Sequence, residues 1–594
     1  MTHSNNTQLV PYLPENMPFN DDQKQWLGGF LAGLHSRLLI KEETVAQSVQ
    51  PAMHIKPLTI IYGSQTGNAE NLAEEAAQMA KNHGLLASVF DMDDISVAQL
   101  SEAERLLVIT STYGDGEMPD NAQLLWDEIS AESAPSFAST YFSVLALGDT
   151  NYDDFCIAGI QWDERLEQLG ATRVAQRIDC DVAYEAPAEQ WMAEALPTIA
   201  QKVSNSEQQS ALTPEQKPKK NKAKFNKESP LQAQLLSKTR LTDECSSKET
   251  IHYELSLMGS GEHYDAGDAL NIVAHNSATL VNDLLSALNA RAEQHETYNG
   301  KTEQLEYIFT ELLEIRQPSK DLIHEIARQS SCPELLSRLG DNQAMSDYLW
   351  GVDTVQLLKR YPDSALSPAQ FIQLAKPMAP RAYSISSSLK KHPDQVHLTI
   401  ASVRYEKGER QHNGVCSTYL ADLVKIGEPV TCYFSANKHF SVPNDLAAPI
   451  IMIGPGTGIA PFRAFLEERE ATQATGDNWL FFGDRNAKTD YLYEQELTQM
   501  QQDGLLTRLD LAFSRDQAEK IYVQDKMLAQ GETLFNWLEQ GAYLYVCGDA
   551  YKMAKDVDTT LQSIIQQYGQ YDESQTQEYM ANLKKQKRYV RDVY

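Results

Sequence analysis

The stretch from Leu58 to Ala69, LTIIYGSQTGNA, decides the fold of the first large part of this chain. Its apolar beginning, Leu58 to Tyr62, predicts a buried strand, and a turn of Ser, Gln, Thr and Gly follows directly. A helical pattern starts after Asn68, so the backbone N–H groups of the turn lie at a helix N-terminus, where phosphate binds well. The sequence therefore predicts a phosphate-binding turn in an α/β domain, although such a turn can also be purely structural.

Further strands alternate with helices after this turn. Apolar runs predict strands at 86–90, 106–111, 142–147 and 173–178, and the pattern is typical of a doubly wound parallel sheet over residues 57–200. Two more loops follow strands of this sheet, and we expect them to meet the same ligand as the first turn. The candidate residues are Ser64, Gln65, Thr66, Gly67, Asn68 and Ala69; Ser111, Thr112, Tyr113 and Gly114; and Leu147, Gly148, Asp149, Thr150, Asn151, Tyr152, Asp153, Asp154, Phe155 and Cys156.

Length and charge restrict the possible functions. A chain of 594 residues forms several domains, and its net charge of −31 argues against nucleic acid or an anionic membrane as a partner. Residues 57–200 contain 25 acidic and 5 basic side chains, so this domain holds most of the negative excess. The acidic surface either serves solubility or docks a basic partner, whose encounter it would steer.

The cysteines and the termini indicate a cellular location. The seven cysteines form no CxxC pair and no metal-ligand spacing, which favours a reduced cytoplasmic protein without a bound metal. The N-terminus lacks the pattern of a signal peptide, and no apolar run approaches the roughly 20 residues that span a bilayer. We therefore expect a soluble, cytoplasmic protein without a membrane partner.

Two segments flank the first predicted domain. Residues 21–39 have an apolar stripe typical of an amphipathic helix, which either packs on its own chain or joins two copies of it. Residues 204–229 are poor in apolar side chains and rich in lysine, which predicts a flexible, solvated linker.

The second half of the chain shows two further patterns. From about Pro230, separated strands such as 268–274, 381–386 and 397–403 predict a small antiparallel barrel, interrupted at about 277–375 by a helical insert that includes 280–292. From about Ala447, strands and helices alternate again. There Gly454 to Gly458 follows an apolar strand and precedes a helix, which predicts a nucleotide loop.

Cationic and hydroxyl side chains indicate which nucleotide binds. Ser514, Arg515, Lys520 and Tyr522 supply two positive charges and two hydroxyls, which suit the 2′-phosphate of NADPH, whereas NADH sites use an acidic residue on the ribose. The candidates in this segment are Ser514, Arg515, Lys520, Ile521, Tyr522, Val523 and Gln524.

Together these motifs, with Arg381 to Ser384, Tyr545 to Asp549 and the ending Arg591 to Tyr594, resemble the diflavin reductase family. Within that family the sequence is most similar to the flavoproteins of assimilatory sulfite reductases that use NADPH. The resemblance implies a flavodoxin-like domain that binds FMN, with Tyr113 and Tyr152 beside the flavin. It also implies a ferredoxin-reductase-like unit that binds FAD in the barrel and NADPH in the last domain.

The resemblance assigns further residues to FAD and to hydride transfer. It implies that Arg381 pairs with the pyrophosphate, that Tyr383 stacks on the flavin, and that Tyr594 covers the ring that nicotinamide must reach. Ser384, Cys547 and Asp592 form the hydride-transfer group by the same resemblance, and the insert's contact near Arg316 stays open. The remaining implied contacts are Ala382, Thr399, Ile400, Ala401, Tyr405, Gly414, Val415, Cys416 and Ser417 for FAD, and Gly456, Thr457 and Asp556 for the nucleotide.

The expected organisation is an oligomerisation segment at 1–56, the FMN domain at 57–200, a linker at 201–229, the FAD domain with its insert at 230–446 and the NADPH domain at 447–594. The resemblance implies electron transfer from NADPH through FAD and FMN to a separate sirohaem and iron–sulfur haemoprotein subunit, which reduces sulfite to sulfide for cysteine biosynthesis. The alternatives are a general reductase for other haem proteins, such as cytochromes P450, and a non-enzymatic assembly subunit.

Overall fold

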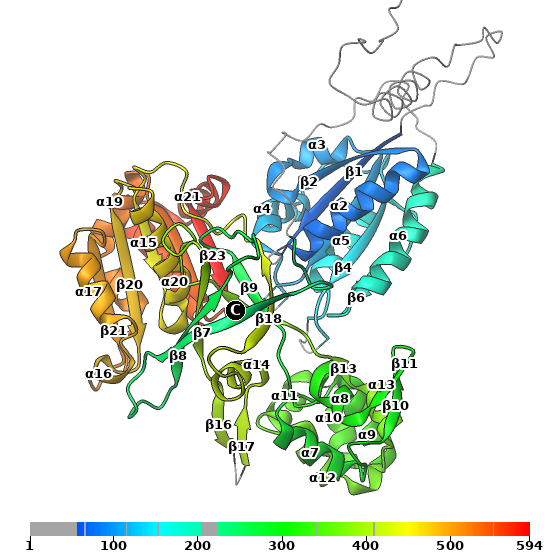
Figure 1. Ribbon diagram of the computed structural model, residues 1–594. Helices are drawn as coiled ribbons and strands as arrows, with labels where there is room; N and C mark the ends of the chain where they lie inside the picture. Colours follow the sequence, from blue (N-terminus) through cyan, green and yellow to red (C-terminus); the bar gives the residue numbers. More distant parts are fainter. Residues whose placement is uncertain are drawn as a thin grey trace, which may run out of the picture. The chain divides into compact units, whose positions relative to one another are not determined.

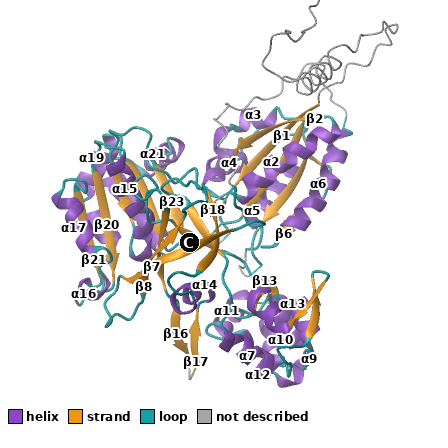
Figure 2. Ribbon diagram, in the orientation of Figure 1, coloured by secondary structure: helices purple, strands orange, loops and turns teal. Residues whose placement is uncertain are grey.

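The computed structural model describes residues 56–64, 67–113, 116–150, 154–202, 224–339, 341–407, 410–550 and 552–594. The expected helix at 21–39 and most of the expected linker lie outside these ranges. Lys56 to Tyr594 forms one compact unit. Its three larger sheets follow one another along the chain, and a helical insert interrupts the second of them (Figures 1 and 2).

The first sheet is parallel, with the strand order β2-β1-β3-β4-β5 and β6 paired to β4. Neighbouring residues of β1 point to opposite faces, so Ile60 packs under α2 and α6 while Ile61 packs under α4 and α5. The sheet is therefore covered by helices on both faces, as the sequence predicted. Its elements are β1 Lys56–Gly63, α2 Asn68–Ala80, η1 Lys81–His83, β2 Leu85–Asp91, η2 Met92–Asp94, α3 Val97–Ser101, β3 Arg105–Ser111, α4 Asp120–Ser130, β4 Tyr141–Leu147, α5 Ile157–Gln168, β5 Thr172–Arg173, β6 Ile178–Cys180 and α6 Glu185–Ala200.

The prediction of one strand at 173–178 was wrong, because the chain forms the two short strands β5 and β6 there. The side chain of Arg177, which lies between them, binds Asp163 at 3.0 Å and Asp179 at 2.6 Å. Between the two short ladders, the N–H of Val174 donates to the carbonyl of Phe142 at 2.9 Å and the Ser143 hydroxyl donates to the carbonyl of Ala175 at 3.2 Å. This stretch is therefore held to β4 partly by a side chain and not by a continuous ladder.

The second sheet is antiparallel, with the order β14-β9-β18-β7-β8-β15. The two end strands approach each other at a single bridge between Ile385 and Leu398, so the sheet curls around its apolar core. Its elements, with a neighbouring hairpin and helix, are β7 Leu231–Arg240, β8 Thr250–Ser256, β9 Ala269–Ile272, β14 Arg381–Ser384, β15 Gln395–Ala401, β16 Arg404–Lys407, β17 Arg410–Asn413, α14 Val415–Thr418, η5 Tyr419–Leu423 and β18 Pro429–Ser435.

The helical insert between β9 and β14 has an apolar core of its own. Its first helix ends at Ala287 rather than at the predicted Ala292, because Asn289 takes a left-handed conformation with φ 50°. The insert contains α7 Ala278–Ala287, β10 His295–Tyr298, β11 Lys301–Gln304, α8 Leu305–Tyr307, η3 Ile308–Leu312, β12 Leu313–Glu314, α9 Lys320–Ser330, α10 Pro333–Arg338, α11 Asn342–Leu349, α12 Thr354–Arg360, η4 Pro362–Ser364, α13 Pro368–Leu374 and β13 Lys376–Pro377.

The third sheet is parallel, with the order β21-β20-β19-β22-β23, and helices pack on both of its faces. The last strand of the chain, β23, lies at one edge beside β22 and carries the residues just before the C-terminus. The elements are β19 Ile450–Ile453, η6 Gly456–Ile459, α15 Ala460–Ala471, β20 Asn478–Asp484, α16 Ala487–Asp490, α17 Glu494–Gln502, β21 Arg508–Phe513, α18 Val523–Ala529, α19 Gly531–Glu539, β22 Tyr543–Gly548, α20 Met553–Gly569, α21 Glu573–Lys585 and β23 Tyr589–Val593.

Candidate functional site

The turn after β1 has the conformation of an anion-binding turn. Gly67 precedes α2 with φ 83°, and the Ser64 hydroxyl accepts hydrogen bonds from the N–H groups of Gly67 at 2.9 Å and Ala69 at 3.3 Å. A side chain at Gly67 would meet only the carbonyl oxygen of Ala436, at 3.7 Å. The helix N-terminus is therefore fixed by Ser64 and open to a ligand; Gln65 and Thr66 lie outside the described residues.

The two other loops of the first sheet meet at the carboxyl ends of β3 and β4. The N–H of Thr112 donates to the carbonyl of Leu147 at 2.9 Å, and the Thr112 hydroxyl accepts the N–H of Ala158 at 3.2 Å. Asp181 holds the second loop, since Thr150 donates to its carboxylate through the hydroxyl at 2.7 Å. Both loops are thus brought together as predicted, although Gly114, Asn151, Tyr152 and Asp153 lie outside the described residues.

The far part of the second loop is packed rather than open. Cys156 is buried with φ 57°, burial raises the pKa of its thiol, and a side chain at Gly148 would come within 2.9 Å of its backbone nitrogen. Asp149 is engaged by the Lys376 ammonium at 3.1 Å. Cys156 therefore packs inside the loop, and Asp149 links the loop to Lys376 in another part of the chain.

The strand β14 presents the predicted FAD residues in different environments. Arg381 and Ala382 are exposed, whereas Tyr383 is half-buried and Ser384 reaches toward the C-terminal strand. Within the described residues, the Arg381 guanidinium forms no hydrogen bond or ion pair. An exposed arginine with no protein partner among the described residues fits a phosphate ligand.

The second predicted FAD loop begins a short helix. The N–H of Gly414 donates to Val403, and the hydroxyl of Ser417 accepts the N–H of Val403 at 3.1 Å. Cys416 is buried beside Tyr383, and burial raises the pKa of its thiol to about 11. Val415 packs on the same apolar core. The loop is therefore held firmly against the barrel.

The predicted residues of β15 and β16 differ in what they contact. Thr399 and Ile400 are buried, and the Thr399 hydroxyl lies 2.5 Å from the hydroxyl of Tyr493 in the third domain. Tyr405 stacks on His412 and accepts a hydrogen bond from the Arg316 guanidinium at 3.1 Å. Arg316, whose role the resemblance leaves open, thus lies beside a predicted FAD contact.

The nucleotide loop approaches the end of β22 closely. A side chain at Gly458 would lie 2.1 Å from the carbonyl oxygen of Cys547, so only glycine allows this contact. Gly456 has φ 59°, and the Thr457 hydroxyl lies 2.7 Å from the Tyr594 hydroxyl. The C-terminal tyrosine, 59% exposed, therefore rests on the loop that is expected to hold the nucleotide.

The predicted 2′-phosphate residues lie after β21. Arg515 and Lys520 are exposed, and the Ser514 hydroxyl and N–H both donate to Asp484. Gln524 donates to Asp556 at 3.3 Å, which joins two predicted residues from different helices. The side chains of Ile521 and Val523 pack on the apolar core instead, so they offer no polar group to a nucleotide.

The predicted hydride-transfer residues converge from three strands. The Ser384 hydroxyl donates to the Asp592 carboxylate at 2.7 Å, and the Cys547 sulfur lies 3.9 Å from the same oxygen. Burial raises the pKa of Asp592, while the hydrogen bond from Ser384 opposes that rise; burial also raises the pKa of Cys547 well above its usual value. Cys547 therefore keeps its proton at neutral pH.

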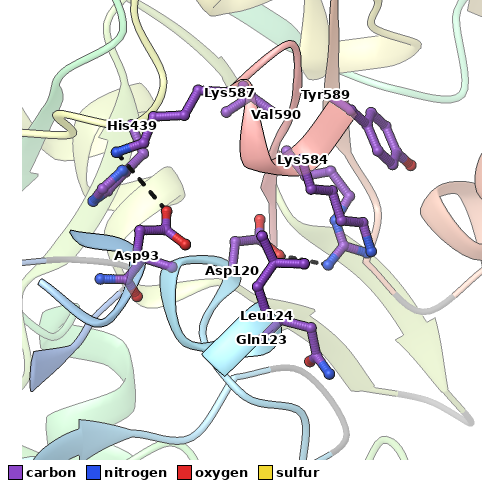
Figure 3. A pocket seen from close by; sticks show the side chains of 11 residues that line it. Asp93, Asp120, Gln123, Leu124, His439, Lys584, Lys587, Tyr589 and Val590 are labelled. Atoms are coloured by element: carbon purple, nitrogen blue, oxygen red, sulfur yellow. Dashed lines mark hydrogen bonds and ion pairs between the residues drawn. The ribbon is translucent and has the colours of Figure 1, made fainter. Parts of the chain in front are cut away.

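Contacts that the sequence did not predict join this group to the first sheet. The Tyr113 hydroxyl donates to the carbonyl of Val593, and Arg591 binds Asp120 at 2.5 Å. Figure 3 shows Asp93 and Asp120 in a pocket that Lys587 and Lys584 also line. No local signal marks such contacts, because Arg591 and Asp120 are 471 positions apart.

The residues present fit the three cofactors that the resemblance implies. The open glycine turn at Gly67 suits a flavin phosphate, the exposed Arg381 suits a pyrophosphate, and the exposed Arg515 and Lys520 suit a 2′-phosphate. Among the described residues, no cluster of His, Cys, Asp or Glu could hold a metal ion. No described helix is both long enough and apolar enough to cross a membrane.

Comparison with known proteins identifies the class of this chain. Residues 60–191 match the flavodoxin family, residues 223–419 the FAD binding domain and residues 452–559 the oxidoreductase NAD-binding domain. The fold and the site thus define a multidomain flavoprotein oxidoreductase that binds FMN, FAD and NADPH.

Curated relatives specify the family further. The sulfite reductase (NADPH) flavoprotein alpha-component of Bacillus subtilis is 39% identical over 595 residues, covering 99% of this chain and 97% of the relative. Those of Photorhabdus laumondii and Vibrio cholerae serotype O1 are 38% and 36% identical, each over 99% of this chain and over 97% and 96% of the relative. The chain belongs to the family of sulfite reductase flavoprotein alpha-components.

Proposed function

We propose that this chain takes electrons from NADPH and delivers them to a separate sulfite reductase haemoprotein subunit for the reduction of sulfite to sulfide. The convergence of Ser384, Cys547 and Asp592 beside the Tyr594–Thr457 contact carries the proposal. When bound, FAD accepts a hydride from NADPH, and FMN passes the electrons on singly. A subunit used only for assembly would not need this buried polar group.

The chain's own residues would position the nucleotide and stabilise charge. Arg515 and Lys520 would hold the 2′-phosphate, and Thr457 would fix Tyr594 over the flavin face until nicotinamide displaces it. The Asp592 carboxylate would stabilise the positive charge that develops on nicotinamide as it loses a hydride. The Ser384 hydroxyl fixes that carboxylate, while the Cys547 thiol retains its proton and closes the space beside it.

The first sheet would hold FMN. The turn at Ser64 to Ala69 and the loops at Ser111 to Gly114 and Leu147 to Cys156 would surround it, with Tyr113 and Tyr152 beside the ring. If residues 57–200 form an independent domain, that fragment should bind FMN and become yellow. A folded fragment that cannot be loaded with FMN would contradict this assignment.

The test of the whole proposal uses the full chain loaded with both flavins. NADPH should bleach the flavin absorption, and adding a sulfite reductase haemoprotein with sulfite should yield sulfide. Absence of bleaching would favour an assembly role, whereas bleaching with transfer to other haem proteins but not to this one would favour a general reductase. Either result would refute the proposed function.

Location and assembly complete the proposal. We propose a cytoplasmic protein that acts in cysteine biosynthesis and forms oligomers through the segment at 1–56, whose expected helix lies outside the described residues. Removing residues 1–50 should leave NADPH-driven dye reduction intact and lower the mass in light scattering to that of a monomer. An unchanged mass would refute the assembly role of this segment.

A further inference from the structure

The C-terminal strand β23 serves two sites at once. Successive residues of a strand point to opposite sides. The Asp592 side chain points to Ser384 and Cys547, whereas the side chain of its neighbour Arg591 points to Asp120 of the first domain. The backbone carbonyl of Val593 accepts a hydrogen bond from Tyr113 of the same domain. A shift of this strand would therefore move both the hydride-transfer group and the surface that the first domain contacts.

The contact on the second side reaches the predicted FMN loop. The Tyr113 hydroxyl donates to the carbonyl of Val593, and Asp120, the first residue of α4, accepts the Arg591 guanidinium at 2.5 Å. The two side chains are 19% and 26% exposed, so water screens this pair less than a surface pair. Burial and Asp120 act in opposite directions on the Arg591 guanidinium, whose pKa is raised on balance.

Other ion pairs also join the acidic first domain to the rest of the described chain. Lys376 binds Asp149 at 3.1 Å and Asp181 at 3.2 Å, and His439 binds Asp91 at 3.0 Å. Lys587 lies 3.9 Å from Asp93. Lys376 lies on β13, His439 on a loop and Lys587 just before β23, whereas Arg591 lies on β23 itself, next to Asp592. The contact of Arg591 with the first domain and the hydride-transfer residue Asp592 thus lie on the same strand.

We propose that Arg591 is a positioning residue for electron transfer from FAD to FMN: its pairing with Asp120 sets the FMN loop at Tyr113 against the strand that carries Asp592. The inference rests on the proposed function. Arg591 binds Asp120 of the first domain, so its loss should slow transfer between the flavins and leave the hydride step in place. The fixed fork of arginine suits this role better than lysine.

The test compares two electron acceptors with the full chain loaded with FAD and FMN. Ferricyanide is small enough to take electrons from either flavin, whereas cytochrome c is a protein that needs the FMN domain. We expect R591E and D120R each to lower cytochrome c reduction at least tenfold, because each places two like charges together where water screens them little. Ferricyanide reduction and the KM for NADPH should stay within twofold.

The charge-reversed double variant R591E/D120R should recover most of the lost cytochrome c reduction. R591K should fall between wild type and R591E, and K585E, which changes an exposed charge on α21, serves as the matched control. Equal losses with both acceptors would mean that Arg591 only supports the hydride site, and an unaffected cytochrome c rate in R591E would mean that the pair positions nothing; both overturn the inference. If wild type reduces neither acceptor with NADPH, the proposed function itself fails.

Discussion

The Ser384 hydroxyl offers a quantitative test of the hydride-transfer group. Ser384→Ala removes the 2.7 Å hydrogen bond to Asp592 and leaves the rest of β14 unchanged. A hydrogen bond to a charged group is worth about 1.5–3 kcal/mol, and about 1.4 kcal/mol corresponds to a factor of ten. If this bond acts fully in the transition state, the rate of flavin reduction by NADPH should fall about ten- to a hundredfold.

The pH dependence gives a second readout of the same variant. The Ser384 bond favours the charged carboxylate and so opposes the effect of burial, which raises the pKa of Asp592. Removing it should raise that pKa further, so the rate should begin to fall at a higher pH than in wild type. Stopped-flow bleaching of the flavin absorption between pH 5.5 and 8.5 measures both effects.

A matched control separates chemistry from packing. Ser435 on β18 pairs with Ala269, as Ser384 does from the other side, and its hydroxyl accepts a hydrogen bond from Asn271 at 2.6 Å. Ser435→Ala therefore loses a neutral hydrogen bond in the same sheet without touching Asp592. A similar loss of rate in both variants, or no loss in Ser384→Ala, would refute the role assigned to Ser384.

Three further predictions follow from the site and its surroundings. Arg515→Ala should weaken NADPH about ten- to a hundredfold and hardly affect NADH, which steady-state KM values would measure; equal weakening would show that Arg515 holds a group common to both. Truncation after Val593 should lower the ratio of the rate with NADPH to the rate with NADH, mainly by raising the rate with NADH. An unchanged ratio would contradict the gating role of Tyr594. Burial lowers the pKa of His252 to about 3 and of His397 to about 2 in the folded protein. Below pH 6.5 both imidazoles therefore gain protons in the unfolded state and not in the folded state, so the free energy of unfolding should fall by about 2.8 kcal/mol for the pair by pH 5.5. In denaturant unfolding, the free energy of unfolding of the His252→Gln/His397→Gln variant should fall less between pH 6.5 and 5.5 than that of wild type. An identical pH dependence would refute the role assigned to the two histidines.

Local patterns in the sequence predicted the elements and the loops. The apolar run at 58–62, the glycine at position 67 and the helix after Asn68 form β1, its turn and α2, because a buried parallel strand and a left-handed glycine leave few alternatives. The glycine loop at 454–458 was recognised in the same way, and the close approach of Gly458 to Cys547 explains why a side chain is excluded there.

Long-range contacts could not be predicted from the sequence. The contacts of Arg591 with Asp120 and of Thr399 with Tyr493 depend on how different sheets pack against each other. The type of a residue does not indicate which distant residue it will contact. The resemblance to a family supplied Asp592 and Cys547, since an aspartate and a cysteine at strand ends are ordinary in isolation. The structure adds that Cys547 and Ser384 contact the same carboxylate oxygen of Asp592.

The charge of the first domain constrains any partner that receives its electrons. Residues 57–200 hold an excess of 20 negative charges, and several of these acids pair with cations from the rest of the chain. Repulsion between copies of this domain disfavours their association, whereas a basic surface is attracted over about 10 Å at an ionic strength of 0.1 M. We therefore expect an electron acceptor that replaces those cations to be basic around its redox centre. Its rate of association should fall steeply as salt is added.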